Sequence, residues 1–195
     1  MEYRVTNEEL LKALSTWDEL LPARGKIHLI ACGGTALTLL GYKTSTKDVD
    51  FLVPNEKEYK KLVKFLKRAG YVRSTGYGWK RPDEVIIYDL YMGNSVYTTA
   101  LLTSPLRKEG NKRIREWKRI YLGALNPIDL IITKIFRGAE VDFEDSLELL
   151  KREKIDLAKL GKRFKETAKY EVSEEKVLRN FALLLTRMKQ AGLKK

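Results

Sequence analysis

The sequence predicts an α+β fold, in which a mixed sheet flanked by helices is followed by a C-terminal helical bundle. Two observations support this class. Short apolar runs bounded by Gly and Pro alternate with helix-like patterns up to about residue 122, and after Asn126 the pattern is helical throughout. No repeat, low-complexity tract or flexible linker is visible. We therefore expect a core at residues 1–122 and a helical region at residues 123–195 packed against it.

The first elements follow from caps and apolar spacing. Thr6 or Asn7 can cap a helix that extends to about Leu21. The run KIHLIAC reads as a buried strand, because it is short and apolar. A Gly-Gly turn then leads into the short helix TALTLLG, and DVDFLVP forms the second strand.

The middle of the chain contains one more helix and less regular segments. Asn55 caps a helix over residues 56–69, and the run EVIIYDLYMG reads as a strand. Residues 104–121 are read as a loop followed by a strand. Asn126-Pro127 then starts a helix, and three more are expected at residues 142–152, 156–169 and 173–191.

Composition excludes several classes of site. Cys32 is the only cysteine and His28 the only histidine, which excludes intramolecular disulfides and zinc sites built from several cysteines or imidazoles. The N-terminus is acidic and amphipathic rather than a signal peptide, and the apolar runs are too short to span a bilayer. We expect a soluble, cytoplasmic protein with no membrane partner.

The net charge of +12 is concentrated in the second half of the chain. Residues 1–100 carry 15 Lys+Arg against 12 Asp+Glu, and residues 101–195 carry 23 against 14. The excess is either a solvated lysine-rich surface or a contact for an anionic partner such as nucleic acid. The densest positive run lies between residues 104 and 121, and we place a candidate RNA contact there at Arg113, Arg115, Lys118 and Arg119.

Three aspartates occur inside strand-like apolar runs, where an unpaired carboxylate is costly. Asp48 and Asp50 are two residues apart, so in a strand both project from the same face, and Asp89 lies in the run VIIYDLYM. Such carboxylates suit Mg2+, which prefers hard oxygen ligands and often binds through carboxylates together with substrate phosphates. Two such ions can clamp the attacking and leaving oxygens of phosphoryl transfer.

The glycines before these aspartates suit the same chemistry. Gly33 and Gly34 lie between a strand and a helix N-terminus, where free backbone N–H groups attract phosphate and missing side chains allow close approach. The hydroxyl of Thr35 can add a donor. The order strand, Gly-Gly, helix, Asp-x-Asp strand and later strand aspartate is more specific than either motif alone.

At these residues the sequence resembles the DNA polymerase beta-like nucleotidyltransferase superfamily. The stretch GGTALTLLGYKTSTKDVDFLV is similar to that superfamily's nucleotide-binding motif, and more narrowly to the AbiEii and MenT-type nucleotidyltransferases of toxin–antitoxin systems. The resemblance implies that Gly33 and Gly34 contact the triphosphate, while Asp48, Asp50 and Asp89 bind Mg2+. Thr46 matches a hydroxyl residue of the motif.

A looser resemblance covers residues 126–152. The stretch DLIITKIFRGAEVDFEDSLELL is similar to the family's C-terminal motif, a helical lysine followed by aspartates. It implies that Lys134 reaches the nucleotide phosphates, and that Asp142 and Asp145 shape the site. Alternatively, Lys134 extends to solvent and Asp142 caps its helix.

Structural alternatives exist for the three aspartates as well. Asp48 can be a turn residue, Asp50 a charge that protects a strand edge, and Asp89 the partner of Arg81 or another base. Tyr42, Lys43 and Lys47 are equally open, as phosphate contacts or solvated loop residues.

The reading that these observations favour is a Mg2+-dependent nucleotidyltransferase. It would transfer a nucleoside monophosphate from an NTP to an acceptor hydroxyl, with Asp89 best placed to activate that hydroxyl. The resemblance implies a tRNA acceptor and an antitoxin partner. The alternatives are a module that binds nucleotide, RNA or a partner toxin without turnover, and an enzyme that modifies a protein side chain.

Overall fold

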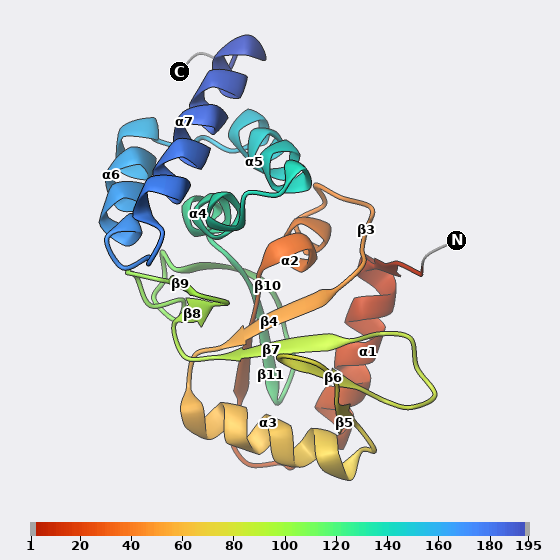
Figure 1. Cartoon of the computed structure of the whole chain (residues 1–195). Coiled ribbons are helices and arrows are strands. Elements are labelled where there is room, and N and C mark those ends of the chain that lie inside the picture. Colours follow the sequence, from red (N-terminus) through yellow and green to blue (C-terminus); the bar gives the residue numbers. More distant parts are fainter. Residues whose placement is uncertain (1–2, 194–195) are drawn as a thin grey trace. The chain divides into compact units, whose positions relative to one another are not determined.

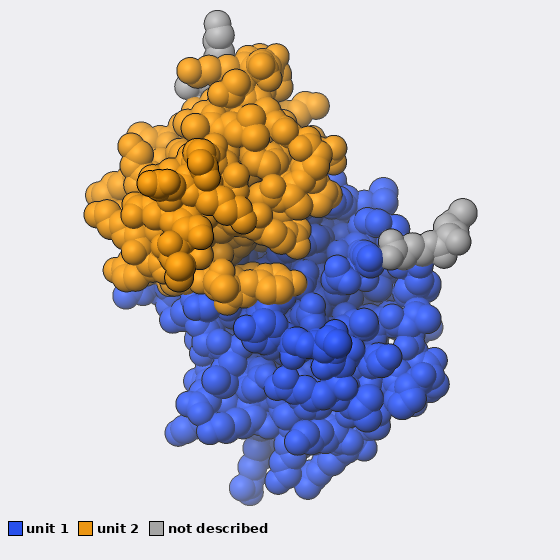
Figure 2. Space-filling model, viewed as in Figure 1, with its two compact units in different colours: residues 1–95, 104–125 blue, residues 96–103, 126–195 orange. Residues whose placement is uncertain are grey.

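The computed structural model describes residues 3–193 (Figure 1). The chain divides into two compact units, which Figure 2 distinguishes by colour. Unit 1 holds the residues up to Ser95 together with Ser104–Leu125, and unit 2 holds Val96–Thr103 together with the residues from Asn126 onward. The division after Leu125 lies three residues beyond the expected boundary, because residues 123–125 complete a strand of unit 1.

Unit 1 is built on a seven-stranded mixed sheet, which confirms the α+β class. The strand order is β10-β11-β2-β4-β7-β6-β5. Strand β4 is parallel to β7 and antiparallel to β2, while β2 is parallel to β11. In chain order the strands are β2 (Ile27–Ala31), β4 (Val49–Val53), β5 (Val72–Arg73), β6 (Gly78–Lys80), β7 (Tyr88–Met92), β10 (Asn111–Glu116) and β11 (Ile120–Leu125).

Helices cover both faces of this sheet. Helix α2 (Gly33–Leu39) lies on one side and α3 (Glu56–Arg68) on the other (Figure 1). Helix α1 (Asn7–Leu20) shares the α3 side, because its Trp17 packs against both Phe65 of α3 and Tyr88 of β7. Tyr88 and Asp89 are consecutive strand residues and so face opposite sides, which places Asp89 on the α2 side.

The caps of these helices are those that the sequence indicates. The Thr6 hydroxyl accepts the N–H of Glu9, and the Glu9 carboxylate accepts the N–H of Thr6. A two-stranded pairing of β1 (Val5–Thr6) with β3 (Ser45–Thr46) ties the segment before Asp48 to the start of α1.

Two strand expectations are wrong in detail. In the run EVIIYDLYMG only Tyr88–Met92 forms a strand, since Val85 and its neighbours lie outside the sheet and the Val85 side chain is exposed. Residues 104–110 form the expected loop, but residues 111–121 contain β10 and the start of β11, so most of a β-hairpin follows instead of one strand. Strand β10 is the sheet edge and alternates irregularly, because a register shift falls between Arg113 and Arg115.

Among the residues that the structure describes, unit 2 contains four helices and most of a small β-ribbon. The helices are α4 (Pro127–Arg137), α5 (Glu140–Arg152), α6 (Leu157–Ala168) and α7 (Glu174–Gln190), within two residues of the expected bounds. Strand β8 (Ser95–Val96) pairs with β9 (Thr99–Ala100), and the Thr98 hydroxyl donates to Glu171. Stacked Phe164 and Phe181, with centroids 4.3 Å apart, join α6 to α7.

None of the helices within residues 3–193 is both long and apolar enough to cross a lipid bilayer.

Candidate active site

Strand β4 brings the expected carboxylates together on the α2 side of the sheet. Asp50 pairs in register with Asp89 of the parallel strand β7, so the two side chains project side by side from strands about 4.8 Å apart. Asp48 directly precedes β4. Asp48 is exposed, Asp89 is partly buried and Asp50 is only 9% exposed.

The electrostatics of Asp89 are unfavourable to its charge. Burial raises the pKa of the Asp89 carboxyl above its usual range, and the nearby charge of Asp48 raises it further. Neither cause comes from a cation. The site therefore gathers negative charge that a bound cation would stabilise.

The structure removes two of the structural alternatives for these aspartates. Strand β4 lies in the interior of the sheet between β2 and β7, so Asp50 does not protect an edge. Arg81 pairs with Asp83 and with Glu84, at 3.2 and 3.5 Å, rather than with Asp89.

Gly33 and Gly34 are the first two residues of α2 and do not form a separate turn before it, and they lie against the same carboxylates. We call this pair of residues the glycine turn. The Cys32 N–H donates to the Asp50 carbonyl at 3.1 Å, so Gly33 begins beside Asp50. Gly33 has a φ of +56°, and a Cβ there would come 2.7 Å from Asp50 Oδ2. A Cβ on Gly34 would come 2.6 Å from Thr46 Oγ1. Both positions therefore require glycine, because a side chain there would collide with Asp50 or Thr46. Helix α2 has only seven residues, so close backbone approach matters more here than a helix dipole.

The hydroxyls of Thr35 and Thr46 are engaged by the backbone of the Asp48–Asp50 segment, and the expected role of both residues in nucleotide binding stays a prediction. Both hydroxyls donate to the carbonyl of Asp48, at 3.0 and 2.9 Å. The Thr35 hydroxyl also accepts the N–H of Asp50 at 2.9 Å, and Thr35 is fully buried. The two threonines thus fix the backbone that carries Asp48 and Asp50, so we interpret them as positioning residues.

Sequence reasoning missed Tyr91. Its hydroxyl donates to Asp50 Oδ1 at 3.3 Å, and its side chain is 2% exposed. The available signal was its spacing, since Tyr91 follows Asp89 by two residues in one strand and so shares its face.

The carboxylate oxygens of this site are ligands of the kind that Mg2+ prefers. Asp48, Asp50 and Asp89 offer hard carboxylate oxygens. Within residues 3–193, no three or more His, Cys, Asp or Glu side chains already converge as a metal site. Mg2+ usually binds one or two carboxylates plus substrate phosphates, so a complete protein cage is not needed. The carboxylate pair beside the glycine turn matches that partial kind of site.

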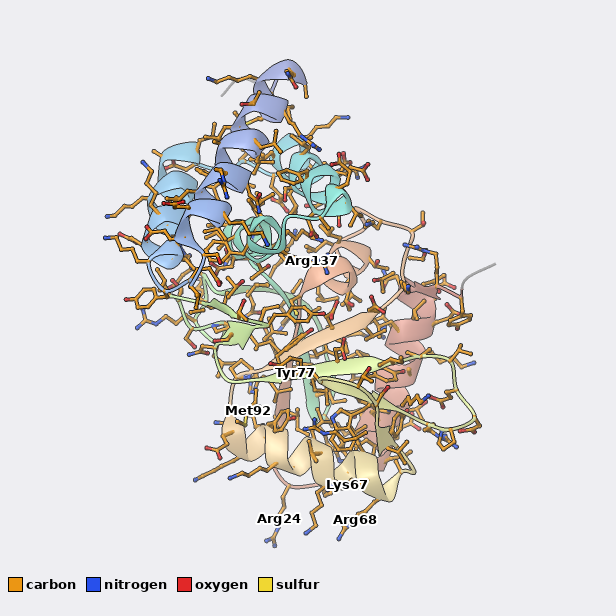
Figure 3. The ribbon with its side chains drawn as sticks, in the orientation of Figure 1. Arg24, Lys67, Arg68, Tyr77, Met92 and Arg137 are labelled. Carbon is orange, nitrogen blue, oxygen red and sulfur yellow. The ribbon has the colours of Figure 1, made fainter. Side chains whose placement is uncertain are left out.

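Lys134 and Asp142 belong to unit 2 and form an ion cluster there. Lys134 Nζ lies 2.7 Å from Asp145 and 3.6 Å from Asp142, and all three side chains are at least nine-tenths buried. Asp142 also accepts the N–H of Ala139 at 3.0 Å and hydrogen bonds from Arg137, which Figure 3 labels. Lys134 is thus not a solvent-extended lysine, and Asp142 does cap its helix. Their contact with nucleotide stays a prediction.

The candidate RNA residues lie on the β10–β11 hairpin of unit 1. Arg113 pairs with Glu116 at 3.3 Å, the Arg115 guanidinium lies over the Trp117 ring, and Lys118 is exposed. Arg119 differs, because it donates to the carbonyls of Asp18 and Glu19 in the last turn of α1. We interpret Arg119 as a helix cap and not as part of an RNA surface.

The mixed sheet flanked by helices, with Gly33 and Gly34 beside a pair of strand carboxylates, is consistent with a nucleotidyltransferase-like fold. Residues 8–192 match a family described as "Nucleotidyltransferase of unknown function (DUF6036)". The chain belongs to this family. No protein of curated function matches the chain.

The glycine turn gives a first testable prediction. Val at Gly34 should weaken NTP binding roughly tenfold or more, equivalent to about 1.4 kcal/mol, because the new side chain displaces Thr46 and fills the approach to the backbone. We expect overpacking to lower the free energy of unfolding by about 1–3 kcal/mol. Calorimetric titration with NTP and Mg2+ measures the first effect and denaturant unfolding the second.

The matched control is Gly161→Ala in α6, where the added Cβ meets only Phe181 at 4.0 Å. This variant should bind NTP like the wild type. Unchanged affinity in Gly34→Val would mean that the glycines serve only the strand–helix connection.

Proposed function

We propose that this nucleotidyltransferase-family protein transfers a nucleoside monophosphate from an NTP to an acceptor hydroxyl in a Mg2+-dependent reaction. The observation that supports this most is the register of Asp50 against Asp89, with Gly33 so close that a Cβ there would come 2.7 Å from Asp50 Oδ2. Negative charge therefore lies beside backbone without side chains, which suits a metal-bound polyphosphate.

The residues of unit 1 have different roles in this proposal. Gly33 and Gly34 admit the triphosphate, and Asp48, Asp50 and Asp89 hold up to two Mg2+ ions. When bound, Mg2+ supplies charge neutralisation at the phosphates. Thr35, Thr46 and Tyr91 keep the carboxylates oriented. Catalysis of this kind consists mainly of positioning and electrostatic stabilisation.

The proposed reaction balances without a further co-reactant. The acceptor oxygen forms a bond to the α-phosphorus, and the bond from that phosphorus to the β-phosphate bridging oxygen breaks. Pyrophosphate leaves, and the acceptor proton passes to Asp89 and then to water. Without metal, burial and the Asp48 charge raise the pKa of the Asp89 carboxyl, whereas a Mg2+ ion held there would favour the ionised carboxylate, which is the form that accepts a proton.

The direct test is incubation of the full chain with each α-labelled NTP, Mg2+ and total cellular RNA or protein. Label on RNA supports the tRNA-type acceptor that the toxin resemblance implies, and label on protein supports a side-chain acceptor. No label with any NTP, in the presence of Mg2+, would contradict nucleotidyl transfer and favour a non-catalytic binding module.

We further propose that the basic hairpin contacts an RNA acceptor and that the protein acts in a toxin–antitoxin-like pair. The hairpin's exposed cations, Arg113, Arg115 and Lys118, support the RNA contact, and the antitoxin depends on the resemblance alone. Growth arrest on expression of the wild type, absent from the Asp89→Asn variant, is the expected signature of a toxin.

Reversing Arg113 and Arg115 to glutamate should weaken RNA binding and flatten its salt dependence. Each neutralised phosphate contributes about 0.7–0.9 to the log–log slope of affinity against salt, because condensed counterions are released. Fluorescence anisotropy with tRNA over a salt series measures the slope. NTP binding should remain at the wild-type level.

The control carries the same charge change elsewhere, at the exposed Lys151 and Lys154 of unit 2. If both double variants and the wild type bind tRNA equally at every salt concentration, the hairpin is a solvated surface.

A further inference from the structure

One exposed aromatic ring lies next to the acidic site. Tyr77, labelled in Figure 3, is 45% exposed, and its ring packs on Tyr91 with centroids 4.8 Å apart. Tyr91 in turn is buried and donates its hydroxyl to Asp50. A single buried ring thus separates the exposed tyrosine from a candidate metal ligand.

The backbone around Tyr77 is held by the sheet. Its carbonyl accepts the N–H of Leu90 at 3.2 Å, and the next residue, Gly78, pairs in register with Asp89. A Cβ on Gly78 would lie 3.2 Å from Asp89 Oδ1, so glycine leaves room beside that carboxylate. The ring of Tyr77 is therefore held at a fixed place, where it packs on Tyr91 while the residue stays 45% exposed.

The strand order shows on which side of the carboxylates Tyr77 lies. Across the sheet, the strands follow one another in the order β2, β4, β7 and β6. The residues at this level are, in the same order, Gly33 after β2, Asp50 on β4, Asp89 on β7 and Gly78 on β6, with Tyr77 just before Gly78. The glycine turn, which under the proposed function admits the triphosphate, lies on one side of the carboxylates. Tyr77 lies on the other side, beyond Asp89. The acceptor must approach from the side opposite the pyrophosphate, since the two partners are in line at phosphorus.

An exposed aromatic ring at the acceptor side suits a planar, π-bearing group. Base–aromatic stacking is tolerant of sequence, because every base has a π-face. Lys80 is exposed on the same face as Gly78, since the two are two positions apart in β6, and a cation there suits the acceptor's phosphate.

We propose that Tyr77 is the stacking platform for a nucleobase of the acceptor, so that the acceptor is a single-stranded nucleic acid end. The inference rests on the proposed function for the direction of approach. It assigns Tyr77 to binding and not to the chemical step.

The test compares an intact with an abasic oligonucleotide in the absence of NTP. The probes are labelled single strands of about six nucleotides, a length within the site size of single-strand binding modules, with the terminal 3′ base present or absent. The variants are Tyr77→Ala, Tyr77→Leu, which keeps apolar contact with Tyr91, and Tyr77→Phe, which keeps the ring. Anisotropy gives the affinities, ribose and deoxyribose probes distinguish RNA from DNA, and thermal unfolding verifies the fold.

We expect Tyr77→Ala and Tyr77→Leu to lose roughly 5- to 150-fold in affinity for the intact strand, the range of one stacked base. Affinity for the abasic strand should change little, and Tyr77→Phe should bind both probes like the wild type. Calorimetric titration of Tyr77→Ala with NTP and Mg2+ should match the wild type.

Three results with the oligonucleotides would overturn the inference: no binding of either strand by the wild type, equal wild-type affinity for intact and abasic strands, or undiminished binding of the intact strand by Tyr77→Leu. Loss of NTP binding in Tyr77→Ala would overturn it as well, because the ring would then serve the nucleotide. Failure of the proposed function gives a different result, because the wild type would then neither bind NTP nor transfer label. The affinities for the intact and abasic strands can still be measured and compared in that case.

Discussion

Replacing Asp89 with asparagine is expected to lower Mg2+-dependent nucleotide transfer by about 100- to 1000-fold, the range for loss of one key electrostatic contact in a catalytic site. The change removes a carboxylate that the register places beside Asp50, while keeping the size of the side chain. Melting temperature should stay the same or rise, because burial and Asp48 already disfavour the charge of Asp89. Transfer of α-label and thermal unfolding are the two measurements.

Asp48→Asn should behave similarly, and Asp83→Asn serves as the matched control. Asp83 is exposed and pairs with Arg81 away from the carboxylate pair, so its loss should leave transfer unchanged. Wild-type activity in Asp89→Asn would contradict the assignment. A collapse of the fold would instead indicate that the carboxylate has a structural function.

Replacing Lys134 with methionine is expected to lower the free energy of unfolding by about 3–5 kcal/mol, the usual effect of breaking a buried ion pair from one side. The side chain of Lys134 is 3% exposed and its ammonium lies 2.7 Å from Asp145, so its removal leaves a buried carboxylate without this cation. Denaturant unfolding of the full chain measures the change.

The double variant Lys134→Met with Asp145→Asn separates stability from binding. Removal of both charges should restore much of the lost stability, because no unpaired carboxylate remains. If Lys134 also binds nucleotide phosphates, NTP affinity stays low in the double variant. If the double variant binds NTP normally, Lys134 is a structural residue, and a single variant as stable as the wild type would contradict the buried-pair argument itself.

The sequence was most informative where one local pattern determines the outcome. The spacing of Asp48 and Asp50, together with a strand around Asp89, was enough to predict a shared face, and the structure places Asp50 beside Asp89. The helix bounds were also close, since caps such as Thr6 and Asn126 act within one turn.

Features that depend on partners far along the chain could not be predicted in this way. Arg119 caps a helix that ends a hundred residues earlier, which no local pattern shows. The sequence assigned the Thr35 hydroxyl to phosphate. Its hydrogen bonds to the Asp48 carbonyl and the Asp50 N–H depend on how α2 packs against β4, which no local pattern shows. The hairpin at residues 111–125 was hidden by the register shift in β10, which breaks the alternation that identifies a strand.

The parallel pairing of β2 with β11 has a consequence for synthesis of the protein. Ile27 aligns with Ile120, so one neighbour of β2 is made only after most of the chain has left the ribosome. Until then β2, four of whose five residues are buried in the native fold, has an open and largely apolar edge. Such non-local pairings form slowly and leave nascent chains prone to association. During synthesis, therefore, the edge of β2 stays exposed until β11, which ends at Leu125, can pair with it. We expect the nascent chain to need chaperones most before that point.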